Sequence, residues 1–156
     1  MIFVVTGTQL PFDRLIKMLD EIAPELNEEI VAQVNGSNYL PRYVNTIDIL
    51  PPDEFDSIFS RARLIVAHAG IGTIISALQN QKPIIIFPRI AALGEHRNEH
   101  QLVTAAKMKE AGWVYVATEK EELRTLLLKP DLHPLCTIGS HASESLIQSI
   151  TDFIMQ

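Results

Sequence analysis

Short apolar segments recur along the chain and alternate with segments whose apolar positions repeat every three or four residues. The first kind is rich in β-branched residues and is bounded by Gly, Pro or Asn, which is typical of buried strands. We predict such strands over residues 2–6, 29–34, 44–50, 64–67, 83–87 and 113–117. Because most of these segments carry few polar side chains, they indicate strands that are covered on both faces.

The second kind of segment predicts amphipathic helices. We expect them over residues 12–22, 53–61, 73–80, 98–111 and 119–128. A last helix is expected over residues 140–155, where one stripe contains Leu146, Ile147, Ile150, Phe153 and Ile154. Apolar strands that alternate with helices predict an α/β fold, namely a doubly wound, Rossmann-like parallel sheet. We expect a single domain over residues 1–156, with 140–156 as its C-terminal helix.

The composition mainly excludes certain classes of protein and of binding site. Thirteen basic and nineteen acidic residues give a net charge of −6, which argues against a protein that binds nucleic acid through its overall charge. The single cysteine, Cys136, excludes a disulfide within the chain and a cysteine-rich zinc site. The N-terminus lacks the features of a signal peptide, and no apolar segment is long enough to span a membrane, so we expect a cytoplasmic protein.

Candidate chemistry lies where the strands end, because ligands of doubly wound sheets bind at that edge. Three segments that are far apart in the sequence follow predicted strands: residues 7–9, residues 68–73 and residues 88–101. We therefore expect them to meet at one site.

The loop over residues 68–73, His-Ala-Gly-Ile-Gly-Thr, leads from a strand into a helix. Gly70 and Gly72 could let a ligand approach the backbone, and the free N–H groups of a helix opened by Thr73 favour an anion such as a diphosphate. The same glycines could instead serve a tight turn that needs a positive φ. The loop is not a P-loop, because no Gly-Lys-Ser/Thr follows, and Ile75 occupies the third glycine position of a dinucleotide fingerprint.

Polar side chains near the same edge are further candidates. His68 could bind a phosphate or a sugar hydroxyl, or it could brace the loop. Gln101, in the first turn of its helix, could bind a ligand or be an exposed polar residue, and Gln33 at the end of the second strand is a weaker candidate of the same kind.

A metal site is a weaker interpretation of the histidines. His96 and His100 are four residues apart, with acidic neighbours, which is a conceivable ligand spacing. Asn98 between them has the character of an N-cap, which would place His96 outside the helix. We therefore expect no metal site.

Several blocks of residues resemble a known family. Residues 68–73, residues 82–88 (Lys-Pro-Ile-Ile-Ile-Phe-Pro) and His100-Gln101 with Ala105 occur in the order and at the spacing of the glycosyltransferase family 28 C-terminal domain. Residues 7–9 (Gly-Thr-Gln), Phe12-Asp13 and Gln33 are similar to its short, single-domain members. These are the catalytic subunit of the dolichol-linked N-acetylglucosamine transferase and bacterial exopolysaccharide glycosyltransferase subunits. The resemblance extends over residues 1–116.

The resemblance implies the C-terminal half of a GT-B enzyme, in which the glycine loop faces the diphosphate of a UDP-sugar and the His-Gln segment faces the sugar. It implies no metal for the nucleotide, in agreement with the lack of an Asp-x-Asp pair after a strand. The candidates for a catalytic role are His68 and His100. The residues that we expect to bind substrate are Gly7, Thr8, Gln9, Gln33, His68, Ala69, Gly70, Ile71, Gly72, Thr73, His100 and Gln101.

Two positions depart from the family pattern. Ser76 stands where the family usually has a Glu that contacts the ribose, so that contact is lost or is taken over by another group. Gln81 stands where a Gly commonly precedes Lys-Pro. Asn80 could adopt the left-handed conformation that ends the helix instead.

From the resemblance we expect the catalytic subunit of an inverting glycosyltransferase that transfers a hexose from a UDP-sugar to a lipid-linked acceptor in polysaccharide or glycolipid biosynthesis. It would use no cofactor and bind no nucleic acid. It would reach the inner face of the membrane through a membrane-anchored, acceptor-binding subunit, with residues 140–156 as the tether. The alternative is a non-catalytic nucleotide-binding or regulatory module, which Ser76 favours. A dinucleotide-dependent oxidoreductase is disfavoured by the failed fingerprint.

Overall fold

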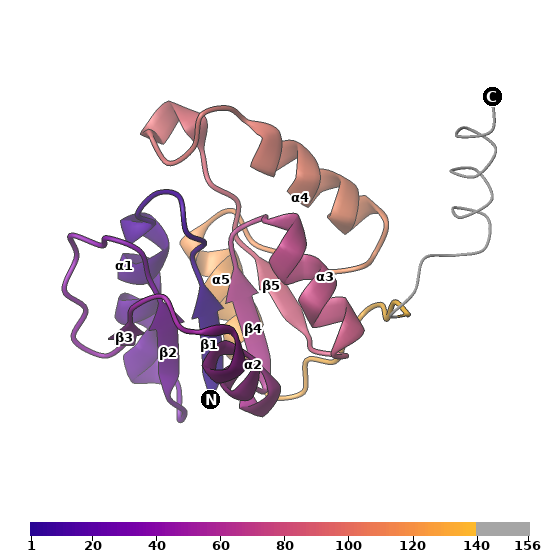
Figure 1. The fold of residues 1–156 in the computed structure, drawn as a ribbon, viewed down its shortest axis with the longest axis horizontal. Coiled ribbons are helices and arrows are strands. Elements are labelled where there is room, and N and C mark those ends of the chain that lie inside the picture. Colours follow the sequence, from indigo (N-terminus) through magenta and orange to yellow (C-terminus); the bar gives the residue numbers. More distant parts are fainter. Residues whose placement is uncertain (140–156) are drawn as a thin grey trace.

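Parallel strands form the centre of the computed structural model, which describes residues 1–139 (Figure 1). Within these residues one six-stranded sheet has the order β3-β2-β1-β4-β5-β6. Every neighbouring pair in it is parallel. The strands are β1 (Ile2–Val5), β2 (Ile30–Gln33), β3 (Asn45–Ile47), β4 (Leu64–Ala67), β5 (Ile84–Ile86) and β6 (Tyr115–Val116). The expected helix over 140–155 and its proposed role as a tether lie outside the described residues.

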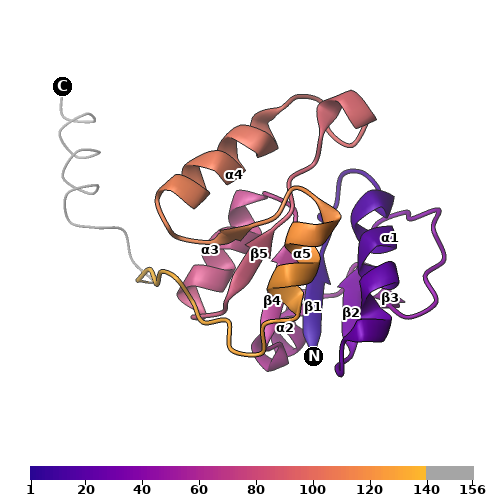
Figure 2. The same ribbon diagram turned by 180° about the vertical axis from the view of Figure 1, so that it is seen from behind.

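Helices cover both faces of the sheet, as the sequence predicts for a doubly wound α/β fold (Figures 1 and 2). Helices α1 and α5 pack on one face, and helices α2, α3 and α4 pack on the other. The helices are α1 (Asp13–Ile22), α2 (Pro52–Arg61), α3 (Ile71–Gln79), α4 (His100–Glu110) and α5 (Lys120–Leu127). Two short 3-10 helices, η1 (Ala23–Glu25) and η2 (Ala91–Leu93), were not expected from the sequence.

The strand pattern explains why two cores form. In β1, Ile2 and Val4 belong to the cluster beneath α1 and α5, whereas Phe3 and Val5 belong to the cluster beneath α2, α3 and α4. All four side chains are buried, so the strand has an apolar residue for each face in turn. Full burial of a side chain of this size stabilises the fold by about 1.5–3 kcal/mol.

Two helix starts near the site differ from the sequence prediction, and so does one helix end. Helix α3 begins at Ile71 rather than at Thr73, and helix α4 begins at His100 rather than at 98. At the other end of α3 the expectation for Asn80 is wrong. Its φ is −86°, and Gln81 takes the positive φ of 53° instead.

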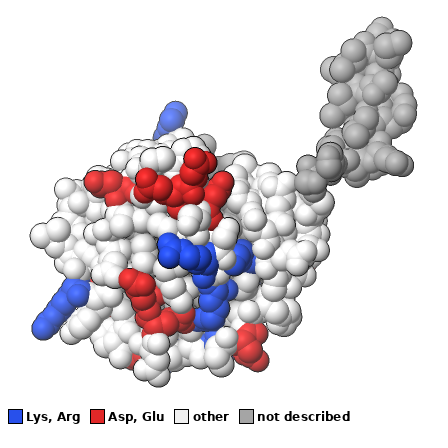
Figure 3. All heavy atoms as spheres, turned by 60° about the horizontal axis from the view of Figure 1, so that its bottom comes forward, with Lys and Arg blue, Asp and Glu red and all other residues white. Residues whose placement is uncertain are grey.

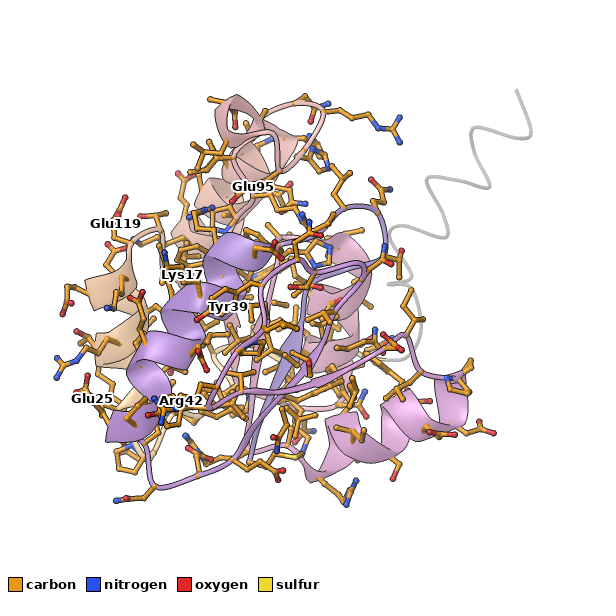
Figure 4. The ribbon with its side chains drawn as sticks, turned by 90° about the vertical axis from the view of Figure 1, so that its left-hand side faces the viewer. Lys17, Glu25, Tyr39, Arg42, Glu95 and Glu119 are labelled. Carbon is orange, nitrogen blue, oxygen red and sulfur yellow. The ribbon has the colours of Figure 1, made fainter. Side chains whose placement is uncertain are left out.

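A buried carboxylate holds the long β2–β3 connection against α1. Asp20 accepts hydrogen bonds from the backbone N–H groups of Arg42, Tyr43 and Val44 and from the hydroxyl of Tyr39. Figure 4 shows Tyr39 and Arg42 alongside that helix. Burial alone would raise the pKa of the Asp20 carboxyl, but the hydrogen bonds outweigh burial and hold that pKa below its ordinary value.

Ion pairs join segments that are distant in the sequence. Glu28 binds both the Met1 amine, at 3.0 Å, and the Arg63 guanidinium. On the face shown in Figure 3, acidic and basic side chains of the described residues are interspersed. No helix within residues 1–139 is both long enough and apolar enough to cross a membrane.

Candidate functional site

The sheet order reverses between β1 and β4, so the loops that follow these two strands diverge to opposite sides of the sheet. A crevice at such a point is where doubly wound sheets bind ligands. A pocket of about 480 Å³ lies there, lined by the β1–α1, β4–α3 and β5–α4 loops. The substrate-binding residues proposed from the sequence all lie in its lining: Gly7, Thr8, Gln9, Gln33, His68, Ala69, Gly70, Ile71, Gly72, Thr73, His100 and Gln101.

The N-terminus of α3 opens into this pocket. Gly70 is its N-cap residue, so the first helical N–H groups are those of Ile71, Gly72 and Thr73. None of these three groups has an acceptor among the described residues. A Cβ atom built on Gly72 would meet nothing within 4 Å. This end of the helix therefore presents free donors, the positive end of the helix dipole and open space, which together suit an anion.

The glycines of the site have different roles. Gly70 has a φ of −84°, and Gly72 is also outside the positive-φ region, so neither serves a turn that needs a left-handed residue. Instead, a Cβ atom on Gly70 would lie 2.7 Å from Cε1 of the His68 ring. Gly7 has a φ of 85°, and a Cβ atom there would lie 2.8 Å from the same Cε1. The imidazole therefore fills the space between two glycines.

His68 is both a brace and part of the pocket lining. Its Nδ1 lies 3.3 Å from the carbonyl oxygen of Val5, so the ring links β4 to the neighbouring β1. Burial lowers the pKa of His68, and the positive charge of Arg89 lowers it further, while the bond to Val5 partly opposes them. The imidazole is therefore neutral at pH 7, with Nδ1–H donating to Val5 and Nε2 free to accept.

Gln101 is buried rather than exposed, with 6% of its surface accessible. Its Oε1 accepts hydrogen bonds from the backbone N–H of Ala69, at 3.2 Å, and of Arg89, at 3.1 Å. One side chain thus joins the β4–α3 loop to the β5–α4 loop. Because its oxygen accepts both bonds, its Nε2 is left as a donor with no acceptor among residues 1–139, and the residue lines the pocket.

Gln33 has a similar bracing role on the other side of β1. Its Oε1 accepts a hydrogen bond from the N–H of Leu50, at 3.1 Å, and its main-chain oxygen accepts one from the Thr6 hydroxyl, at 3.0 Å. The β1–α1 loop is held in turn by Asn35, whose side chain donates to the carbonyl of Thr8. Thr8 and Gln9 are exposed at the mouth of the pocket.

Sequence reasoning missed the charged groups of the site. Arg89, which follows β5, is 3% exposed and lines the pocket. Burial lowers the pKa of its guanidinium, and the charge of Glu95 opposes this shift. Glu95 also lines the pocket, and Arg14 binds both of its carboxylate oxygens, at 2.7 and 2.8 Å. The sequence signal for this group is an Arg shortly after a buried strand, at the edge where ligands bind.

The histidines of the β5–α4 segment do not form a metal cluster. His96 is half-buried and His100 is exposed, and Nδ1 of His96 lies 3.0 Å from the carbonyl of Asn98. Asn98 accepts a hydrogen bond from the N–H of His100, as a capping side chain does, although it stands one residue before the N-cap position. Among residues 1–139, no group of three His, Cys, Asp or Glu side chains is placed to hold a metal ion.

Comparison with known proteins identifies the family. The model of the glycosyltransferase family 28 C-terminal domain matches residues 1–154. The chain belongs to this family. No curated protein sequence matches it.

Solved structures show the same fold for this family 28 domain. The solution structure of ALG13 aligns over 96% of this chain and 93% of its own, with a TM-score of 0.58 and 18% identity. MurG from Acinetobacter baumannii aligns with a TM-score of 0.63 and 18% identity, over 98% of this chain but 49% of its own. The glycosyltransferase SnogD from Streptomyces nogalater has a TM-score of 0.55 and 20% identity, over 81% of this chain and 34% of its own. The chain therefore has the fold of the C-terminal, Rossmann-like half of a GT-B glycosyltransferase.

Proposed function

We propose that this family 28 domain binds a UDP-sugar and is the catalytic subunit of an inverting glycosyltransferase that transfers a hexose to a lipid-linked acceptor. The observation that carries the proposal is the free N-terminus of α3 in the pocket between β1 and β4. The N–H groups of Ile71, Gly72 and Thr73 are available to a diphosphate, which is the charged part of the donor.

The rest of the pocket suits the other parts of the donor. Gln101 and His100 both line the pocket at the start of α4, and Nε2 of Gln101 is a neutral donor. Both suit sugar hydroxyls. Ser76, at the position where the family has a ribose-binding Glu, is outside the pocket lining, so Gln33 is the nearest match for the ribose on the β2 side.

The chemistry follows from this placement. The acceptor hydroxyl attacks the anomeric carbon from the face opposite the diphosphate, the bond from that carbon to the phosphate oxygen breaks, and the configuration inverts. The α3 N-terminus stabilises the negative charge that develops on the leaving UDP. The acceptor proton goes to a general base. This chain's candidates are His100 and the neutral His68, and otherwise the partner supplies the base.

A second subunit completes the proposal. The printed sequence corresponds to 93% of ALG13, 49% of MurG and 34% of SnogD. We infer that a membrane-anchored subunit holds the acceptor and brings this chain to the inner face of the membrane, with residues 140–156 as the tether.

The binding step is tested by titrating the protein with UDP, UMP and uridine in a calorimeter. Gly72→Asp places a negative charge at the α3 N-terminus, where the diphosphate is expected to bind. The two negative charges repel, so UDP affinity should fall at least about tenfold. Gly72→Ala is the matched control, because its Cβ atom meets nothing within 4 Å and adds no charge. Equal UDP affinity in wild type and Gly72→Asp would remove the α3 N-terminus from the proposal.

The catalytic step is tested by transfer of a labelled sugar from UDP-sugars to a lipid acceptor, with and without the partner subunit. We expect turnover only with the partner. Full turnover by the isolated chain would contradict the half-enzyme architecture. Tight UDP binding without turnover in the complete complex would favour a regulatory module instead.

A further inference from the structure

Arg89 is a buried cation at the centre of the loops that form the pocket. Its Nη1 donates to the carbonyls of Pro11, at 2.7 Å, and Glu95, at 3.1 Å. Its Nη2 donates to the carbonyls of Thr6 and Leu10, both at 2.6 Å. The guanidinium also lies 4.5 Å from the centre of the Phe12 ring. These contacts fix the β1–α1 loop to the β5–α4 loop.

The charge of Arg89 has no direct ionic partner among residues 1–139. The carboxylate of Glu95 acts on it through space, but both Glu95 oxygens are bound by Arg14, which also donates to the carbonyl of Pro88. Figure 4 shows Glu95 beyond the upper end of α1. The two guanidinium groups and this single carboxylate leave the region with a net positive charge.

A purely structural link between the loops would need donors but not a charge. Burying a charge without a counter-ion costs free energy, and neutral side chains often replace buried ionic groups without loss of stability. The carbonyl dipoles stabilise the Arg89 cation but do not neutralise it. An anion in the pocket that Arg89 lines would supply the missing counter-charge.

We propose that Arg89 is a positioning residue that gives the pocket its preference for a diphosphate, because it fixes the β1–α1 loop and places an unneutralised positive charge beneath the ligand. This inference rests on the proposed function for the identity of the nucleotide, but not for the anion itself. The ligand chemistry that it names is a diphosphate, whether this is free or part of a nucleotide.

The experiment compares Arg89→Gln, Arg89→Lys and wild type for binding of UDP, uridine and inorganic pyrophosphate. In Arg89→Gln we expect UDP and pyrophosphate affinities to fall about tenfold or more, and uridine affinity to change less than about threefold. Arg89→Lys keeps the charge with fewer donors, so it should recover most of the ratio of UDP to uridine affinity. Arg63→Gln is the matched control, because it also removes a guanidinium that binds carbonyls, and it is outside the pocket lining.

The outcomes separate this inference from the proposed function. An unchanged ratio of UDP to uridine affinity in folded Arg89→Gln overturns the role of Arg89 while the proposed function stands. Pyrophosphate binding that depends on Arg89, without any preference for UDP, supports the role of Arg89 and overturns the nucleotide. Loss of UDP and uridine binding in equal proportion shows that Arg89 is only structural.

A second measurement observes ligand binding in the wild-type protein itself and uses a variant only to assign the signal. The Arg89 Nε resonance of the wild-type protein, assigned by its loss in Arg89→Lys, should shift when UDP or pyrophosphate is added and stay in place with uridine. A resonance that responds to none of the anions while they bind would overturn the inference.

Discussion

The contact between Gly70 and the His68 ring makes a quantitative test of how the β4–α3 loop is built. Gly70→Ala would place a methyl group 2.7 Å from Cε1 of the imidazole and closer still to Nε2. The φ of −84° at this position is one that alanine adopts freely, so backbone strain adds nothing. The expected loss of stability therefore comes from the steric conflict alone.

The structure also limits how that conflict can be relieved. The ring cannot retreat toward β1, because the backbone at Gly7 is there, and rotating it would break the bond from Nδ1 to Val5, at 3.3 Å. Overpacking of this kind costs about 1–3 kcal/mol. In a protein of this size each kcal/mol corresponds to about 2–4 °C in Tm, so a cost of about 2 kcal/mol lowers Tm by about 4–8 °C. Gly72→Ala has no such contact and should leave Tm unchanged or slightly raised.

The assay is thermal and urea unfolding of wild type, Gly70→Ala, His68→Ala and the double variant. Removing the ring should relieve the conflict, so the double variant should be more stable than the sum of the single changes predicts, by about 1 kcal/mol or more. Additive effects, or a Gly70→Ala protein as stable as Gly72→Ala, would refute the idea that His68 dictates glycine at position 70.

Three further predictions concern single side chains. Gln101→Leu leaves the buried N–H groups of Ala69 and Arg89 without an acceptor, so it should lower the free energy of unfolding in urea by about 2–4 kcal/mol. Gln101→Glu keeps both hydrogen bonds, so its Tm should stay near the wild-type value. Its binding of UDP-sugar should nevertheless weaken. Asp20→Asn should lower Tm at pH 7. The folded-state pKa of Asp20 is lowered, so the carboxylate stabilises the fold above its unfolded-state pKa of about 3.9. That stabilisation is lost as the pH falls through the folded-state pKa. The Tm values of wild type and Asp20→Asn should therefore approach each other as the pH falls below about 4. UDP binding should survive EDTA in calorimetry, because Glu95 is the single carboxylate in the described pocket lining and Arg14 holds it; loss of binding that manganese restores would contradict this.

The sequence predicts the sheet well because its strands are short apolar segments with polar residues at their ends. The segment 64–67 is apolar and bounded by Arg63 and His68, and its strand has those bounds in the structure. Helix starts were harder. Gly70 caps α3 without a side-chain hydrogen bond, so the sequence carries no capping signal there. The sequence predicts Thr73 as the first helical residue, whereas the helix begins at Ile71. Local patterns locate an element, but the conformation of one backbone residue decides where it begins.

At the candidate site, too, the sequence predicts the location of the residues but not their individual contacts. The topology of a parallel sheet is enough to bring Gly7, His68 and Gln101 to one edge, and the structure places them around one pocket. The hydrogen bonds of Arg89 to four carbonyls, and the two hydrogen bonds that Gln101 accepts, depend on which carbonyl and N–H groups of separate loops face each other. Those contacts join residues up to 83 positions apart, so no local pattern contains them.

The hydrogen bonds among the three pocket loops have a consequence for how the chain binds its ligand. Arg89 joins the β1–α1 loop to the β5–α4 loop, and Gln101 joins the latter to the β4–α3 loop, so the described side of the pocket is preorganised. A preorganised pocket spares its ligand the entropy of ordering loops. If the proposed complex with a second subunit forms, the isolated chain should bind the proposed sugar nucleotide with nearly the affinity of that complex, and the second subunit should change the rate of transfer rather than the choice of sugar nucleotide.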